Sequence, residues 1–449
     1  MLALLLVAGC RGSAPADRPD DSTSATSSAT RPPDVVLVVV DAMRGDHTGY
    51  MGLDLPATPN LDLLATEMAW FSRAYAASCW TLPSTVSLLT GKYTWEHRAV
   101  RDMDNREQFG RLRDNIQSLA TVHQDKGYRT AGFVNNTLLA PEFGLSQGFD
   151  VYDFHGAAPV GHRTAHEAVE AARAWLDSSD KPAFLLVHIQ EPHEDYDPPA
   201  PFAGRFREGL SHQVETPLGE LDIKAMRRGL LPLTDDDRAY IRAVYDEEIL
   251  AADDAIGQLV RHLRTRDGWN ELELVITADH GEEFWDYGGY EHGHTTRTAV
   301  TRVPLLIKIP GVKPGENRSV VSHLDVHALL TGGGDELRSL VASGEHVPGR
   351  VAVSEGGLYG PPEASIVTDD LRLIIHLENN PPTADLYAID ERGREIDDLG
   401  NDPAQRDRAA PLFAELERLR GHLSPVDAEQ PVSLNPDIIE QLRALGYVE

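Results

Sequence analysis

A run of β-branched and aliphatic residues that ends at a carboxylate constrains the fold of this chain most. Residues 34–40 read DVVLVVV, and Asp41 follows them directly. A continuous apolar run of this length predicts a strand that is buried on both faces, as in the middle of a parallel sheet. Comparable runs occur at residues 128–134, 183–189, 272–277 and 303–309.

Helical patterns alternate with these runs. Thr58-Pro59 opens one helix with a capping residue and a proline in the first turn, and residues 163–176 and 235–266 carry two more. This alternation predicts an α/β fold in which a large mixed, mostly parallel sheet is flanked by helices. Ligands of such sheets bind at the carboxyl ends of the strands, so the residues after each strand are site candidates.

The pattern changes after about residue 345, where the predicted strands become shorter. We expect a main domain over residues 34–344 and a small C-terminal α+β subdomain over residues 345–449. Residues 198–232 are rich in proline, glycine and charge, which predicts a surface lid or insertion. The C-terminal pattern comprises strands at 350–354, 371–377 and 385–389 and helices at 404–423 and 435–445.

The first residues, MLALLLVAGC, are apolar but too few to span a bilayer. They fit a signal peptide over residues 1–10 whose end resembles the bacterial lipoprotein box, in which Cys10 becomes lipidated. Residues 11–33 have the composition of a flexible linker. We therefore expect an extracytoplasmic protein, in the periplasm or at the cell surface, that meets the membrane through a lipid anchor only. The alternative is a buried N-terminal strand.

The charge balance argues against one class of binding partner. The chain has 41 Lys and Arg against 71 Asp and Glu, a net charge of −30. A surface this acidic repels phosphate backbones, so we expect no nucleic-acid partner. With 41% hydrophobic and 25% charged residues the composition is that of a soluble globular protein.

Several strand ends carry metal-binding residue types. Asp41 follows the first strand, Asp279 and His280 follow the strand at 272–277, and His292 and His294 lie in a glycine-rich loop. Carboxylates and histidines gathered in this way predict a divalent-metal site. Taken alone, Asp41 is better explained as a turn-capping residue.

Thr81 stands before a short predicted helix, which Pro83 opens and Gly91 ends. Free N–H groups and the helix dipole at that position favour a bound tetrahedral anion. The alternative for Thr81 is an N-cap hydroxyl. A further strand end carries Glu191 and His193, whereas His188, inside the apolar run, is expected to be a buried core histidine.

Together these segments resemble the sulfatase branch of the alkaline phosphatase superfamily. The resemblance covers about residues 34–449 and implies a hydrolase that takes a small-molecule or glycan anionic ester. At the C-terminal end, DLYAIDERGREIDDLGNDP and IIEQLRALGYVE look like the tail of that family. The other segments that carry the resemblance are VVLVVVDAMRGDHTGY, ATPNLDLLA, WTLPSTVSLLTGKY, HIQEPHEDYDPP, ITADHGEEFWDYGGYEHGH and RVPLLIKIPG.

The resemblance assigns roles residue by residue. It makes Asp41, Asp279 and His280 metal ligands, and it places Ala42 where many members have a second acidic ligand. His193, and His292 or His294, match positions that contact the transferred group or protonate the leaving group. One divalent ion per chain is expected, Ca²⁺, Mn²⁺ or Zn²⁺, although His193 with Glu191 and His294 is a candidate second site.

The nucleophile departs from the family pattern. Sulfatases carry Cys or Ser in a C/S-x-P-x-R motif, whereas residues 81–85 read TLPST. Formylglycine is therefore not expected, and Thr81 becomes both nucleophile and fourth metal ligand. A threonine hydroxyl needs a metal or base to react, and it lacks the second hydroxyl with which formylglycine ejects sulfate. P–O cleavage is therefore slightly favoured over S–O cleavage. The alternatives are a transferase with a phosphothreonine intermediate and a non-catalytic binding protein.

Overall fold

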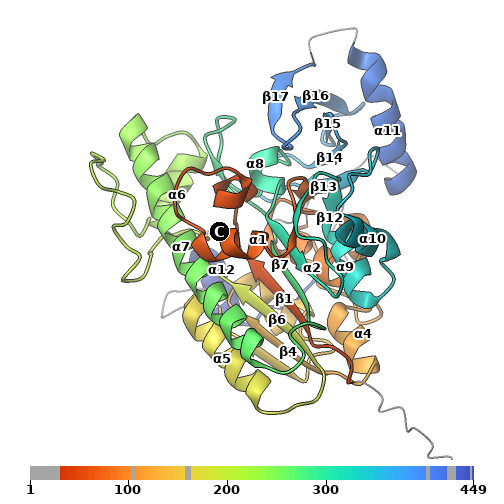
Figure 1. Ribbon diagram of the computed structural model, residues 1–449. Coiled ribbons are helices and arrows are strands. Elements are labelled where there is room, and N and C mark those ends of the chain that lie inside the picture. The colour runs from red at the N-terminus through yellow and green to blue at the C-terminus, as the bar shows by residue number, and fades with distance from the viewer. Residues whose placement is uncertain are drawn as a thin grey trace, which may run out of the picture. The chain divides into compact units, whose positions relative to one another are not determined.

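A mixed sheet of eight strands, in the order β11-β2-β10-β7-β1-β6-β4-β5, forms the centre of the computed structural model (Figure 1). β1 (Val35–Val40) is buried along its whole length and pairs in parallel with β6 (Ala183–Ile189) and β7 (Glu273–Ala278). β10 (Leu305–Lys308) runs antiparallel to β7. The remaining strands of the sheet are β2 (Ala69–Phe71), β4 (Arg129–Val134), β5 (Val151–Phe154) and β11 (Gly315–Asn317).

Helices cover both faces of this sheet. On one side α5 (Ala165–Asp177) packs on β6 and on the long helix α7 (Asp235–Thr265), which also contacts α1 (Pro59–Ala65). Figure 1 shows α5 and α7 on one side of the sheet and α4 and α9 on the other. The second layer consists of α2 (Thr81–Thr90), α4 (Leu119–Asp125), α9 (His323–Thr331) and α10 (Asp335–Ser343).

The C-terminal part of the chain forms an antiparallel sheet of its own, which α11 (Arg406–Arg420) covers against a separate apolar core. The predicted fold class, a mostly parallel sheet with a smaller C-terminal α+β unit, is therefore confirmed. α12 (Pro436–Ala444) behaves differently, because its Ile438 and Leu442 join the core of the large sheet. The strands of the small sheet are β13 (Ala352–Gly356), β14 (Glu363–Val367), β15 (Leu371–His376), β16 (Thr383–Ile389) and β17 (Glu395–Asp398).

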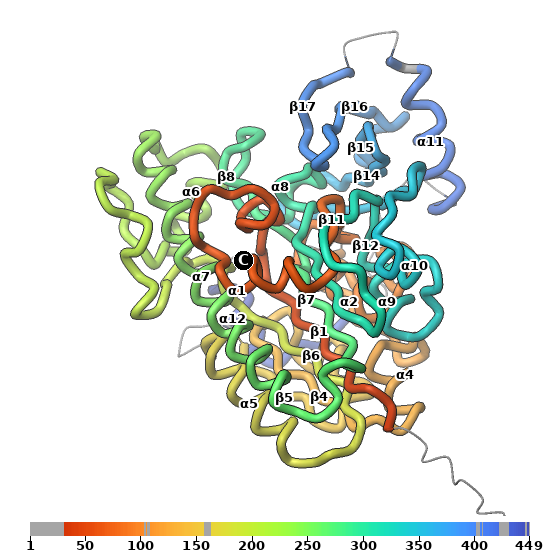
Figure 2. Tube along the Cα trace, viewed as in Figure 1, coloured from red at the N-terminus to blue at the C-terminus, as the bar shows by residue number. Residues whose placement is uncertain are grey.

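The segment between β6 and α7 contains one helix, α6 (Glu220–Arg227), among loops. Figure 2 shows this yellow-green segment outside α7, on the side away from the five-stranded sheet. The other short elements are β3 (Ala74–Tyr75), β8 (Glu283–Phe284), β9 (Tyr290–Glu291), β12 (Val321–Ser322), α3 (Thr94–His97), α8 (Thr298–Thr301), η1 (Gly45–His47), η2 (Gly49–Met51), η3 (Thr137–Leu139) and η4 (Pro141–Phe143).

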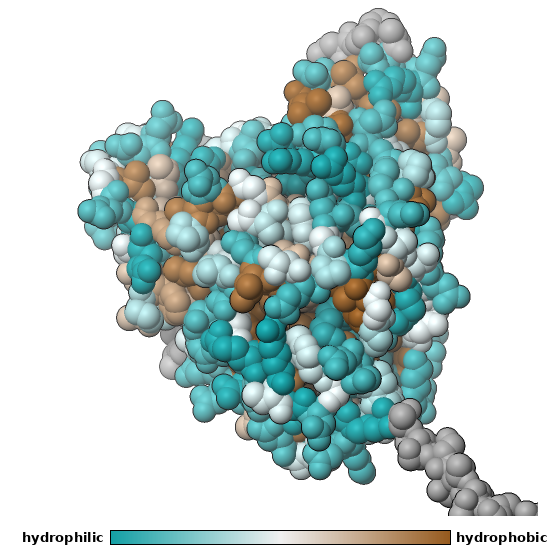
Figure 3. Space-filling view, in the orientation of Figure 1, coloured by the Kyte–Doolittle hydropathy of each residue, from teal (hydrophilic) through white to brown (hydrophobic). Residues whose placement is uncertain are grey.

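The visible surface is mostly hydrophilic, with small separate apolar patches (Figure 3). In the part of the chain that the structure describes, no helix is both long and apolar enough to cross a bilayer. The predictions for the signal peptide, Cys10 and the linker up to residue 30 lie outside the described residues. The structure describes residues 31–102, 105, 108–156, 163–400, 405–421, 431–444 and 447–448.

Candidate active site

The carboxyl ends of β1 and β7 bring three predicted metal ligands together. One ligand atom each from Asp41, Asp279 and His280 lies within 4.8 Å of the others, and all three residues are buried. His280 Nε2 lies 3.5 Å from Asp41 Oδ1 and 3.7 Å from Asp279 Oδ2. The rule that ligands gather at the carboxyl ends of parallel strands accounts for this grouping.

Thr81 joins the same group from the start of α2. Its Oγ1 donates to Asp41 Oδ1 at 3.5 Å and lies 3.3 Å from His280 Nε2. Thr81 is the first residue of α2, and Trp80 occupies the N-cap position, so the expectation that Thr81 precedes the helix was wrong by one residue. The Thr81 hydroxyl faces the carboxylate and the imidazole, which the N-cap alternative does not explain.

Two further residues complete the surroundings of Asp41. Asn136, two residues beyond β4, donates from Nδ2 to Asp41 Oδ2 at 2.5 Å. His188 lies within β6, and its Nε2 is 3.9 Å from Asp41 Oδ2 and 3.7 Å from Asp279 Oδ2. Sequence reasoning missed Asn136, although its place after a strand was a usable signal. It assigned His188 to the core, where the structure has it buried but facing the site.

The surroundings shift the pKa values of Asp41 and Asp279 in opposite directions. Burial raises the pKa of Asp41, and the neighbouring Asp279 raises it further. Burial acts on Asp279 too, but His280 and His188 outweigh it and hold the pKa of Asp279 at about 2. The backbone N–H groups of Ala42 and His280 donate to Asp279 Oδ1 at 3.2 and 2.8 Å.

Asp279 Oδ2 is buried and has no hydrogen-bond partner among the described residues. A buried carboxylate oxygen without a partner is costly unless a cation or proton meets it. The carboxylates of Asp41 and Asp279, the imidazole of His280 and the hydroxyl of Thr81 form a donor set that fits a divalent cation. Ala42 brings no carboxylate to this set, as expected from the sequence.

A second buried group adjoins the first one. One ligand atom each from His193, Glu194 and His292 lies within 4.8 Å of the others, and Glu194 Oε2 lies 3.7 Å from His193 Nδ1 and 3.9 Å from His292 Nδ1. The rings of His292 and His280 are 4.4 Å apart at their centroids. The two groups therefore form one continuous buried site.

This second group differs from the one suggested by the sequence, which joined His193 to Glu191 and His294. Glu194 and His292 are the partners in the structure. The side chain of His294 is 24% exposed, and its Nε2 contacts Glu283 Oε2 at 2.9 Å. Of the two histidines in the glycine-rich loop, His292 is the one beside the metal-ligand candidates.

Buried polar groups orient the second group. His292 Nδ1 lies 3.1 Å from Glu282 Oε1, and Tyr196 donates to Glu282 Oε2 at 3.3 Å. Burial raises the pKa of Glu282 well above its ordinary value, and Glu194 adds to this effect. Arg227 Nη2, 3.6 Å from Glu194 Oε1, supplies an opposing positive charge.

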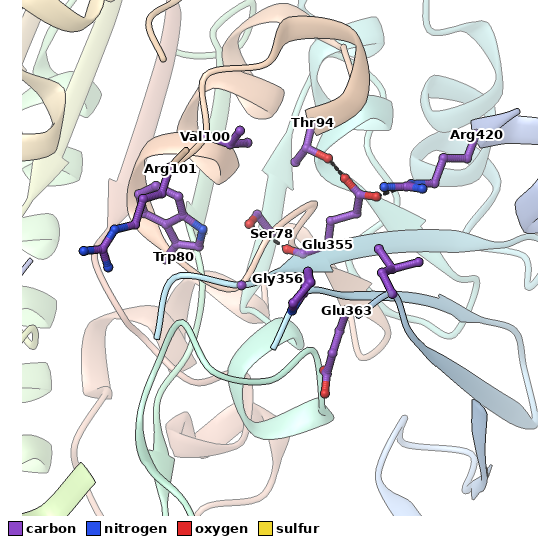
Figure 4. Close-up of a pocket in the computed structure, with 12 residues that line it drawn as sticks. Ser78, Trp80, Thr94, Val100, Arg101, Glu355, Gly356, Glu363 and Arg420 are labelled. Atoms are coloured by element: carbon purple, nitrogen blue, oxygen red, sulfur yellow. Dashed lines mark hydrogen bonds and ion pairs between the residues drawn. The ribbon is translucent and has the colours of Figure 1, made fainter. Parts of the chain in front are cut away.

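A small pocket lies beside the start of α2, between that helix and the five-stranded sheet. In it Glu355 contacts Thr94 and Arg420 (Figure 4), so its carboxylate is already paired. The pocket reaches Trp80 but none of the residues of the two buried groups, and it is separate from the candidate site. Its lining consists of Ser78, Trp80, Thr94, Val100, Arg101, Glu355, Gly356, Gly357, Pro362, Glu363, Leu377 and Arg420.

The sequence profile described as Sulfatase matches residues 33–331, which hold both buried groups. The chain belongs to the sulfatase family. This sulfatase-family protein is 25% identical over 406 residues to the uncharacterized sulfatase YidJ of Escherichia coli K12, covering 77% of this chain and 79% of YidJ. It is 22% identical to the N-acetylglucosamine-6-sulfatase of Capra hircus, over 68% of this chain and 60% of that enzyme.

Solved structures share the fold of this sulfatase-family protein. The phosphonate monoester hydrolase of Agrobacterium radiobacter superposes with a TM-score of 0.69 at 20% identity, covering 90% of this chain and 100% of that one. A protein solved with its substrate D-glucosamine-2-N,6-O-disulfate gives a TM-score of 0.69 at 17% identity, covering 89% of this chain and 100% of that one. Family and fold together make the protein a hydrolase of ester bonds.

Proposed function

We propose that this hydrolase cleaves an anionic ester with Thr81 as its nucleophile and one divalent ion as its cofactor. The observation that carries the proposal is the position of Thr81 Oγ1, 3.5 Å from Asp41 Oδ1 and 3.3 Å from His280 Nε2. A hydroxyl at the start of a helix and among metal-ligand candidates is suited to attack a tetrahedral anion.

Asp41, Asp279 and His280 would hold the ion together with Thr81. A bound divalent ion would polarise the ester and lower the pKa of the threonine hydroxyl. The donor set contains both carboxylate oxygens and an imidazole nitrogen, which suits Mn²⁺ or Zn²⁺, and its oxygen-rich part also suits Ca²⁺.

Side chains of the protein carry out the attack and assist the departure of the leaving group. Thr81 Oγ1 gives its proton to Asp41 Oδ1, to which it donates a hydrogen bond, and forms the new bond to phosphorus or sulfur, while the bond to the leaving oxygen breaks. His292 lies next to His280, and His193 lies next to His292. Both histidines contact the transferred group or protonate the leaving oxygen, while Glu282 orients His292 through Nδ1. Water then cleaves the bond to Thr81 and restores the free hydroxyl.

We favour phosphate esters over sulfate esters as substrates. Formylglycine expels sulfate through its second hydroxyl, and threonine has none, whereas water can hydrolyse a phosphothreonine. The sulfated-glucosamine substrate of one structural relative supports a glycan sulfate as the competing substrate class. We also propose that the protein acts outside the cytoplasm, anchored through lipidated Cys10, which mass spectrometry of the mature N-terminus tests.

The test is a turnover panel of the purified protein against aryl sulfate, phosphate monoester, phosphodiester and phosphonate ester, with Ca²⁺, Mn²⁺ and Zn²⁺ added separately. We expect phosphoester turnover with Mn²⁺ or Zn²⁺ that Thr81→Ala abolishes. Thr90→Ala is the matched control, because Thr90 is the last residue of the same helix and its Oγ1 donates to Val86 O inside that helix. Full turnover by Thr81→Ala would disprove the nucleophile.

A further inference from the structure

Tyr447, two residues from the end of the sequence, reaches into the candidate active site. Its hydroxyl lies 3.0 Å from His193 Nε2 and 3.5 Å from His292 Nε2, and the whole side chain is buried. His193 and His292 come from loops that follow β6 and β9, so the C-terminal segment supplies a third side chain to the place where they meet.

The described part of this segment is fixed by the main core. Ile438 and Leu442 of α12 pack into the core of the large sheet, and the Tyr447 backbone N–H donates to Leu442 O at 2.8 Å. Thr137 Oγ1, in the turn after Asn136, donates to Gln441 Oε1 at 3.0 Å. These contacts place the Tyr447 ring against the site rather than leaving it at the surface.

The hydrogen-bond partners of the two histidines show why a hydroxyl fits at this point. His193 Nδ1 lies 2.8 Å from Glu194 O, and His292 Nδ1 lies 3.1 Å from Glu282 Oε1. A carbonyl only accepts hydrogen bonds, so His193 Nδ1 is occupied as a donor, and His292 Nδ1 is occupied by Glu282. Both rings therefore turn Nε2 toward Tyr447.

A phenol hydroxyl has one proton, which it can donate to only one acceptor at a time. Two imidazole Nε2 atoms that face a single hydroxyl therefore leave that hydroxyl free to exchange one of them for a substrate oxygen. The ring itself is held from behind, because it stacks on Tyr359 with centroids 6.1 Å apart and planes 9° apart.

We propose that Tyr447 donates a hydrogen bond to the leaving oxygen of the ester, beside His193 and His292. This inference rests on the proposed function, which puts the leaving group at these histidines. When the bond from phosphorus or sulfur to the leaving oxygen breaks, the electron pair goes to that oxygen and its negative charge grows. The Tyr447 hydroxyl stabilises this charge, and no bond of Tyr447 is formed or broken.

Tyr447→Phe removes only the hydroxyl and tests the proposal through two substrates. With an alkyl phosphate, whose leaving oxygen carries the full charge, we expect kcat to fall about 100-fold. With 4-nitrophenyl phosphate, whose leaving charge is spread over the ring, we expect a loss of about threefold or less. Tyr359→Phe is the control: it keeps the stacked ring, changes a hydroxyl next to Arg227, and should show the same ratio as the wild type.

An equal loss with both substrates, or none, would overturn the role of Tyr447 while leaving the proposed function intact. Wild-type protein that turns over neither of these two phosphates nor any ester of the turnover panel would refute the proposed function and this inference with it. Thermal unfolding of Tyr447→Phe separates lost stability from lost chemistry. A protein with 3,5-difluorotyrosine at position 447 keeps ring and hydroxyl, and its more acidic phenol should speed the alkyl ester alone; an unchanged rate would count against the proposal.

Discussion

Asn136 fixes the orientation of Asp41: its Nδ2 donates to Asp41 Oδ2 at 2.5 Å, while its Oδ1 accepts from the backbone of Leu138 at 2.8 Å. The second bond holds the amide in place, so that NH₂ and not the carbonyl faces the carboxylate. Asp41 Oδ1 is thereby left to Thr81 and His280. This arrangement is that of a residue which orients a candidate metal ligand from behind.

We therefore predict that Asn136→Ala lowers metal affinity about 10- to 100-fold without abolishing the fold. Titration of metal-free protein with Mn²⁺ or Zn²⁺ measures the change. Asn135→Ala is the matched control at the same strand end, since Asn135 bonds Arg163 instead of Asp41. Equal affinities of wild type and Asn136→Ala would show that the amide does not support the ligand.

Removal of the candidate ligand Asp279 should lower metal binding more than removal of Asn136, which only orients a candidate ligand. Asp279→Ala deletes the carboxylate whose Oδ2 has no hydrogen-bond partner in the described part of the chain. We expect bound metal, measured by elemental analysis after dialysis, to fall below about a tenth of an equivalent. Chelation of the wild type should abolish turnover, and the same ion should restore it. Metal content that stays at the wild-type level in Asp279→Ala would remove this residue from the site.

Substitution of the two histidines of the glycine-rich loop should have clearly different effects on kcat. His292 lies beside His280 and is fully buried, whereas His294 is partly exposed and bonds Glu283. We predict that His292→Ala lowers kcat about 100-fold or more, within the range for a lost acid–base group, and that His294→Ala changes it less than about threefold. Steady-state kinetics of both variants decides the point, and a reversed order would return the role to His294.

The candidate metal-ligand group could be predicted from the sequence because a simple rule applies to it. Asp41, Asp279 and His280 each follow an apolar run, and parallel strands put their carboxyl ends at one edge. The same rule covers Asn136, which was overlooked because an amide is a less common metal-site residue than a carboxylate. The rule does not predict His188, because this residue lies inside β6. It faces Asp41 only because of the register between β6 and β1.

The positions of Tyr447 and Glu194 in the candidate site could not be predicted from the sequence alone. Tyr447 is 254 residues from His193, and no local pattern says that α12 leaves the five-stranded sheet and packs on the large one. The choice of Glu194 over Glu191 depends on the path of a loop without periodicity. Such contacts arise from tertiary packing, and a periodic pattern in the sequence carries no information about them.

A buried histidine away from the site gives a prediction about acid stability. Burial lowers the pKa of His97 to about 3, against an ordinary value of 6.5. Its Nδ1 accepts from the Ala99 N–H at 3.0 Å, and its Nε2 lies 3.1 Å from Ser87 Oγ. Protonation of Nδ1 would break the first of these bonds inside the core.

The folded pKa lies below the unfolded one, so the contribution of neutral His97 to stability is complete above pH 6.5 and is lost as the pH falls toward 3. Between pH 7.5 and pH 5 the loss amounts to about 2 kcal/mol. We predict that urea unfolding of the wild type and of His97→Gln shows this shift: the stability of the wild type relative to the variant should shrink by about that amount at pH 5. A difference that is the same at both pH values would mean that His97 takes up a proton as readily in the folded core as in the unfolded chain.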